Sequence, residues 1–109
     1  MGIQLQIADS KNVEIMGFYV VKSPYHKTPK YLPFWVKSKS FEKDKYNVIT
    51  CEYKGWKRSE VDTIYMESTI KDLLEANIIL PAERVGTYLM EKKCQELYEE
   101  YKFRVKYNL

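Results

Sequence analysis

The stretch PAERVGTYLMEKKCQELYEEYKFRVK, residues 81–106, decides the fold that this sequence predicts. Its apolar and small residues recur at spacings of three and four, which is the repeat of one helix face. They are Gly86, Met90, Cys94, Leu97, Tyr98, Tyr101 and Val105. Pro81 suits a first helical turn, where its missing N–H is not needed, and Arg104 and Lys106 suit the last turn. The pattern therefore predicts one long amphipathic helix over residues 81–106.

The chain before this helix alternates between short apolar runs and polar turns. In residues 2–8, isoleucine and leucine alternate with glutamine, which is typical of a half-buried strand. Further strands are predicted at residues 13–22, 31–37 and 46–54, and residues 60–67 fit a strand or a helix, with the strand preferred. Pro33 cannot donate to a central ladder, so it favours an edge position for its strand.

A short second helix is predicted between the strands and the long helix. Thr69 and Asp72 have capping-box spacing, and Asn77 suits the C-terminal end, which gives a helix over residues 69–77. Strands followed by helices indicate an α+β fold with the helices on one face of an antiparallel sheet. We therefore expect one domain, residues 1–109, in which a small antiparallel sheet of four or five strands (residues 2–67) is covered by helices 69–77 and 81–106.

Composition limits where such a protein works. At 109 residues with 45% hydrophobic content, the chain is long enough for a folded core. It contains no apolar run of membrane-spanning length, and its first residues lack the pattern of a signal peptide. Lysine outnumbers arginine 15 to 3 among the basic residues, and tyrosine is abundant, as in AT-rich genomes. We expect a protein with no membrane contact in the cytoplasm of a bacterial host cell, of phage or mobile-element origin.

Catalytic chemistry has little support in the sequence. Nucleophilic catalysis needs a nucleophile, a base and an orienting group in contact. The only histidine, His26, lies in a predicted loop, while Cys51 and Cys94 lie in a predicted strand and helix face, where buried free thiols are expected. Two cysteines and one histidine do not form a zinc site without carboxylates, and no glycine-rich phosphate loop is present. We expect no catalytic residues, no metal, no cofactor and no enzyme activity.

The segment from Lys22 to Arg58 combines cations with aromatic residues. It holds ten Lys and Arg residues against three acids, whereas residues 61–109 hold seven basic and nine acidic residues. Lysines beside exposed rings can bind a phosphate backbone while the rings stack on bases. Equally, the rings can form the core while the lysines protect sheet edges. The candidate binding residues are Tyr25, Lys27, Lys30, Tyr31, Trp35, Lys37, Trp56, Lys57 and Arg58.

Two tryptophans in this segment are the candidate anchors. Alternation along residues 31–37 predicts that at least one of Phe34 and Trp35 points away from the core, and Trp56 lies in a Gly-Trp-Lys-Arg turn. Exposed Trp, Tyr and Arg residues are also favoured anchors of protein interfaces. The end of the long helix offers a second surface, made of Tyr98, Tyr101, Phe103 and Val105.

Three functions follow as hypotheses. The first is a non-catalytic binding protein that blocks a larger host protein or nucleoprotein, such as a defence factor, through protein contact. The second is a nucleic-acid-binding module that uses the Lys/aromatic face of residues 22–58. The third, compatible with either, is a homodimer formed through the long helix.

Overall fold

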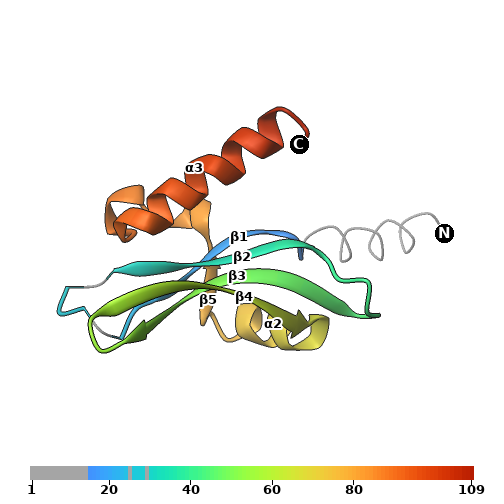
Figure 1. The fold of residues 1–109 in the computed structure, drawn as a ribbon, viewed down its shortest axis with the longest axis horizontal. Helices are drawn as coiled ribbons and strands as arrows, with labels where there is room; N and C mark the ends of the chain where they lie inside the picture. The colour runs from blue at the N-terminus through green and yellow to red at the C-terminus, as the bar shows by residue number, and fades with distance from the viewer. Residues whose placement is uncertain (1–14, 25, 29) are drawn as a thin grey trace.

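Five antiparallel strands form the centre of the molecule in the computed structural model, which describes residues 15–24, 26–28 and 30–109 (Figure 1). The strands are β1 (Gly17–Lys22), β2 (Tyr31–Lys39), β3 (Lys45–Lys54), β4 (Lys57–Met66) and β5 (Ile79–Pro81). Their order in the sheet is β4-β3-β2-β1-β5, so β1 to β4 form a meander and β5 joins its first strand. The strand expected over residues 2–8 lies outside the described residues.

The hairpin of β3 and β4 confirms the strand prediction for residues 60–67 over most of its length. Lys54 pairs with Lys57, so Gly55 and Trp56 alone form the turn. Gly55 has a φ of 65°, which only glycine adopts without strain, and a two-residue hairpin of type II′ needs such a residue first.

Strand β2 is central, so the edge position expected from Pro33 is wrong. Pro33 pairs with Val20 of β1, whereas the ladder between β2 and β3 runs from Trp35 to Lys39. The missing N–H of Pro33 therefore falls beyond the end of that second ladder. A proline is tolerated in a central strand here because only one side of the strand is paired at that position.

The two helices lie on opposite faces of the sheet, and not on one face as the sequence led us to expect (Figure 1). Helix α2 (Glu67–Glu75) packs its Ile70, Leu73 and Leu74 against a first core beneath the strands. That core also contains Tyr19, Phe34, Val36, Tyr46 and Val48. Because both faces are covered, both alternating sets of strand side chains can be buried.

Helix α3 (Lys92–Lys106) covers a second core on the other face. This core contains Phe18, Val20, Trp35, Ala82, Val85, Met90 and Cys94. Residues Ile49, Leu97, Tyr98 and Tyr101 pack against it from β3 and α3. Of the two neighbouring residues Val48 and Ile49, which point to opposite faces, Val48 in the α2-side core is the more deeply buried.

The helix predicted over residues 81–106 is real only from Lys92 onward, so its first eleven residues were wrongly assigned. Residues 79–81 form β5, which pairs with β1, and two short 3-10 turns follow, Ala82–Arg84 and Thr87–Leu89. Ala82, Val85 and Met90 of this part are buried in the core between the sheet and α3, although none of them lies on an α-helix. Tertiary packing can thus produce helix-like spacing in a segment that is not α-helical.

The ends of both helices depend on specific residues. Asn77, at a φ of 58°, closes α2, because the Asn77 and Ile78 amides donate to the Leu74 and Leu73 carbonyls. This Schellman arrangement confirms the role expected of Asn77. The predicted start at Thr69 is two residues late: α2 begins at Glu67, and no side chain caps it. Within the described part of the chain, no helix is long and apolar enough to cross a bilayer.

Candidate binding surfaces

One end of the sheet brings together four of the nine residues predicted to bind a partner, Lys27, Lys30, Trp56 and Lys57. The loop between β1 and β2 and the Gly55–Trp56 turn lie at this end, and the His26 and Tyr53 rings meet edge to face at 5.7 Å. Trp56 is 95% exposed at the tip of the hairpin, as its turn position predicted. The exposed lysines at this end are Lys27, Lys54 and Lys57, and Lys30 is half-buried. We call these four lysines and Trp56 the hairpin-end surface.

Arg58 lies beside this end but faces inward. Its Nε and Nη2 donate to the two carboxylate oxygens of Glu91 at 2.8 and 2.9 Å, and only 16% of its side chain is exposed. Burial lowers the pKa of the Arg58 guanidinium, but the hydrogen bond and charge of Glu91 outweigh it and raise that pKa overall. Arg58 therefore connects β4 to α3 and has little surface left for a partner.

Three further predicted residues lie elsewhere. Trp35 is 3% exposed and Phe34 is 4% exposed, so the expectation that one of them points outward is wrong. Tyr31 is half-buried against the α3-side core. Lys37 is exposed on β2, away from the hairpin end, and Tyr25 lies outside the described residues.

The four residues predicted on the long helix separate into two pairs. Tyr98 and Tyr101 are half-buried and pack on Phe18, with ring centroids 5.3 and 5.7 Å from it. Phe103 and Val105 are 55% and 59% exposed. Phe103 is two residues from Tyr101 and therefore lies on the opposite side of α3. Val105 is on the side of Tyr101 but is exposed because α3 is inclined to the sheet, so that its last turns stand farther from the strands than its first (Figure 1).

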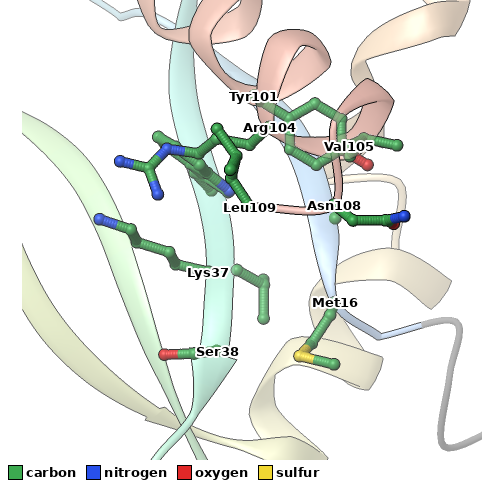
Figure 2. Close-up of a pocket in the computed structure, with 11 residues that line it drawn as sticks. Met16, Lys37, Ser38, Tyr101, Arg104, Val105, Asn108 and Leu109 are labelled. Atoms are coloured by element: carbon green, nitrogen blue, oxygen red, sulfur yellow. The ribbon is translucent and has the colours of Figure 1, made fainter.

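Beneath these last turns the molecule has a hollow of about 840 Å³. Figure 2 shows side chains of α3 above it and of the sheet below it, with Leu109 reaching between them. Its lining is mainly apolar with two cations, and consists of Met16, Gly17, Trp35, Val36, Lys37, Ser38, Tyr101, Arg104, Val105, Asn108 and Leu109. A hollow of this volume is in the range of binding pockets.

Several exposed apolar residues were missed by the sequence prediction. Met16 and Leu109 are 42% and 75% exposed, and both line the hollow. Phe41, in the turn between β2 and β3, is 99% exposed at the end of the sheet opposite Trp56. Tyr107 is 55% exposed and follows Phe103 by four residues, and the centroids of their rings are 4.7 Å apart.

The two thiols are buried or half-buried, and the histidine contacts a neighbouring hydroxyl. Cys94 is fully buried, and burial raises the pKa of its thiol to about 12. Cys51 is half-buried, and its pKa is also raised by burial. His26 Nδ1 lies 2.9 Å from the Ser23 hydroxyl. Within residues 15–24, 26–28 and 30–109, no three His, Cys, Asp or Glu side chains are grouped as metal ligands.

Comparison with known proteins adds no functional assignment. The chain matches no protein-family model, no curated protein and no solved structure.

Proposed function

We propose that this protein is a non-catalytic binding protein that acts by protein–protein contact through the end of α3. The supporting observation is the concentration of exposed apolar side chains there. Phe103, Val105, Tyr107 and Leu109, each at least 55% exposed, lie within seven residues, and the hollow lies beside them. We call these four residues the α3-end surface.

Exposing apolar side chains to water is unfavourable, so a cluster of them on a surface indicates a site where a partner covers them. Single exposed apolar residues are ordinary, but contiguous apolar patches mark sites of interaction. The rings of Phe103 and Tyr107 lie 4.7 Å apart and form one such patch. Val105 and Leu109 line the hollow on another side of the helix, with the charged Arg104 and Lys106 between the two groups along the chain. Aromatic and aliphatic anchors with charged neighbours are the usual anatomy of a transient protein interface.

The proposed partner is a larger host protein or nucleoprotein, for example a defence factor, which the protein blocks by covering a surface. The phage-like composition of the chain motivates this choice of partner. The proposal needs no catalytic group and no cofactor.

A capture experiment with matched variants tests the proposal. The tagged chain is compared with Phe103→Ser and with the control Lys93→Ser, whose side chain is 58% exposed on the first turn of α3. We expect a bacterial protein that is retained by the wild type and the control but lost with Phe103→Ser. Its purified form should then bind with an affinity at least tenfold weaker for Phe103→Ser. Equal retention by all three proteins would refute the α3-end surface.

A second candidate function, nucleic-acid binding, is favoured by the hairpin-end surface. Trp56 offers a fully accessible ring between Lys54 and Lys57, with Lys27 and Lys30 on the neighbouring loop. Rings that stack on bases and lysines that contact phosphates are the elements of single-strand binding. Two oligonucleotides, single-stranded and double-stranded, titrated at 50 and 200 mM salt would test this.

Nucleic-acid binding predicts a steep loss of affinity with salt and a further loss in Trp56→Ala. Binding that is absent at both salt concentrations rejects this second function and leaves the first untouched, because the two surfaces share no residue.

A further inference from the structure

Lys37 lies between two apolar hollows on the α3 side of the sheet. The first is the hollow beneath the end of α3, and the second, of about 300 Å³, lies over β3 and β4. Lys37 and the residues Asn47, Val48, Ile49, Asp62, Thr63 and Ile64 line this second hollow. The two hollows therefore adjoin at Lys37.

A β-bulge in β2 explains why the Lys37 side chain lies between the two hollows. The register between β2 and β3 shifts between Val36 and Ser38, which leaves Lys37 as the extra residue of a bulge. Bulges re-aim side chains and are frequent beside functional sites. The Lys37 Nζ lies 5.3 Å from the centre of the Trp35 ring, an arrangement that favours the cation over the ring face.

Charge in the two hollows is unevenly placed. Among the described residues, no carboxylate lies within ion-pair distance of Lys37, so its three N–H donors have no anionic partner in the fold. Arg104, the second cation of the first hollow, donates through Nε to Glu100 at 3.0 Å, and in Figure 2 it points to the same side as Lys37. Among the described residues that line either hollow, Asp62 is the only one with a carboxylate side chain, and it lies on β4.

We infer that the two hollows form one groove that binds an extended segment of a partner protein. In this partner segment, two apolar side chains flank a carboxylate. The carboxylate pairs with Lys37, and one apolar side chain enters each hollow. In an extended segment, residues two apart point to the same side at about 6.6–6.8 Å spacing. The recognised pattern is therefore apolar-x-acid-x-apolar. This inference rests on the proposed function and specifies the chemistry of its partner.

Trp35 provides a direct readout, because it lines the first hollow and is one of two tryptophans in the chain. In the Trp56→Phe variant, Trp35 is the only remaining tryptophan. We would titrate this variant with the peptide Ser-Leu-Ser-Glu-Ser-Leu-Ser, blocked at both ends. Two control peptides carry lysine in place of glutamate, or serine in place of both leucines. We expect a change in Trp35 emission with the first peptide and at least tenfold weaker binding of both controls.

A charge-reversal variant tests whether peptide binding depends on Lys37 itself or on the positive charge of the protein in general. In the Trp56→Phe background, Lys37→Glu should bind the glutamate peptide at least tenfold more weakly and gain binding of the lysine peptide. Lys39→Glu is the matched control. It lies on the same strand, but it pairs with Tyr46 of the α2-side core, so its side chain lies on the other face. This control should bind the glutamate peptide like its parent.

The outcomes distinguish this inference from the proposed function. Equal binding of the glutamate and lysine peptides, or an unchanged Lys37→Glu variant, overturns the groove. A dimer in sedimentation that Lys37→Glu abolishes also overturns it, because the occupant is then a second copy of the chain. If no peptide binds while Phe103→Ser still abolishes partner capture, the groove is wrong and the α3-end surface stands.

Discussion

Arg58 of β4 and Glu91 at the N-cap of α3 are 33 residues apart in the chain and are joined by two hydrogen bonds of 2.8 and 2.9 Å. The same Glu91 carboxylate accepts from the Cys94 amide at 2.6 Å, and the Glu91 amide donates to the Tyr31 carbonyl at 2.9 Å. One residue thus caps the helix, neutralises a largely buried cation and attaches the helix to β2 and β4.

The first prediction concerns this contact. Glu91→Ala removes the cap and leaves Arg58 largely buried without its carboxylate, and we expect it to lower the free energy of unfolding by about 2–4 kcal/mol. Glu91→Gln keeps a hydrogen-bond acceptor for the Cys94 amide and should cost less. Urea denaturation followed by circular dichroism measures both. A loss below about 0.5 kcal/mol for Glu91→Ala would mean that the contact does not fix α3.

The second prediction tests whether both faces of the sheet are covered. Phe34 lies in the α2-side core and Trp35 in the α3-side core, so Phe34→Ala and Trp35→Ala should each cost about 3–5 kcal/mol. The control Phe41→Ala, at a side chain that is 99% exposed, should stay within about 0.5 kcal/mol. Where an alanine variant does not fold, Phe34→Leu and Trp35→Phe give the same comparison at smaller cost. A Trp35 variant as stable as Phe41→Ala would contradict the two-sided core.

The third prediction concerns the turn between β3 and β4. Gly55 has a φ of 65°, and an added Cβ would meet nothing within 4 Å, so the penalty of a substitution is conformational and not steric. We expect Gly55→Ala to lower the free energy of unfolding, measured by thermal denaturation, by about 1 kcal/mol. Gly55→Asn should also lower it, because a type II′ turn favours glycine at its first central position. Trp56→Ala, at the adjacent exposed position, should change stability by less than about 0.5 kcal/mol. Equal stability of Gly55→Ala and the wild type would exclude the strained turn.

The fourth prediction is a loss of stability at high pH. Burial raises the pKa of the Cys94 thiol to about 12, so the folded protein keeps this proton while an unfolded thiol loses it above about pH 8.5. The unfolded state then binds fewer protons than the folded state, and stability falls as pH rises from about 9 toward 12. The raised pKa values of Cys51 and Tyr101 act in the same direction.

Urea midpoints at pH 7, 9 and 10 measure this effect. Cys94→Ala should be less stable at pH 7, because it leaves a cavity, but its midpoint should fall less between pH 7 and 10 than that of the wild type. An identical pH dependence in the two proteins would mean that Cys94 is not the group responsible.

The sequence by itself determined the elements whose signals are local. Alternation predicted the strands of the meander, Asn77 predicted the end of α2, and the Gly-Trp turn predicted the exposed Trp56. Each of these features depends on the conformational preferences of a few consecutive residues, so a short window of the sequence is enough to predict it. The α+β class followed from the same signals.

Only the tertiary structure decided which faces are buried and where α3 begins. Trp35 is buried because a helix covers each face of the sheet, and alternation cannot distinguish a second core from solvent. Residues 81–91 have helix-like spacing, but pairing of Pro81 with β1 and the hydrogen bonds of Glu91 to Arg58 and Tyr31 end that pattern. Such contacts join residues distant in sequence, so their energies are absent from any local window of the chain.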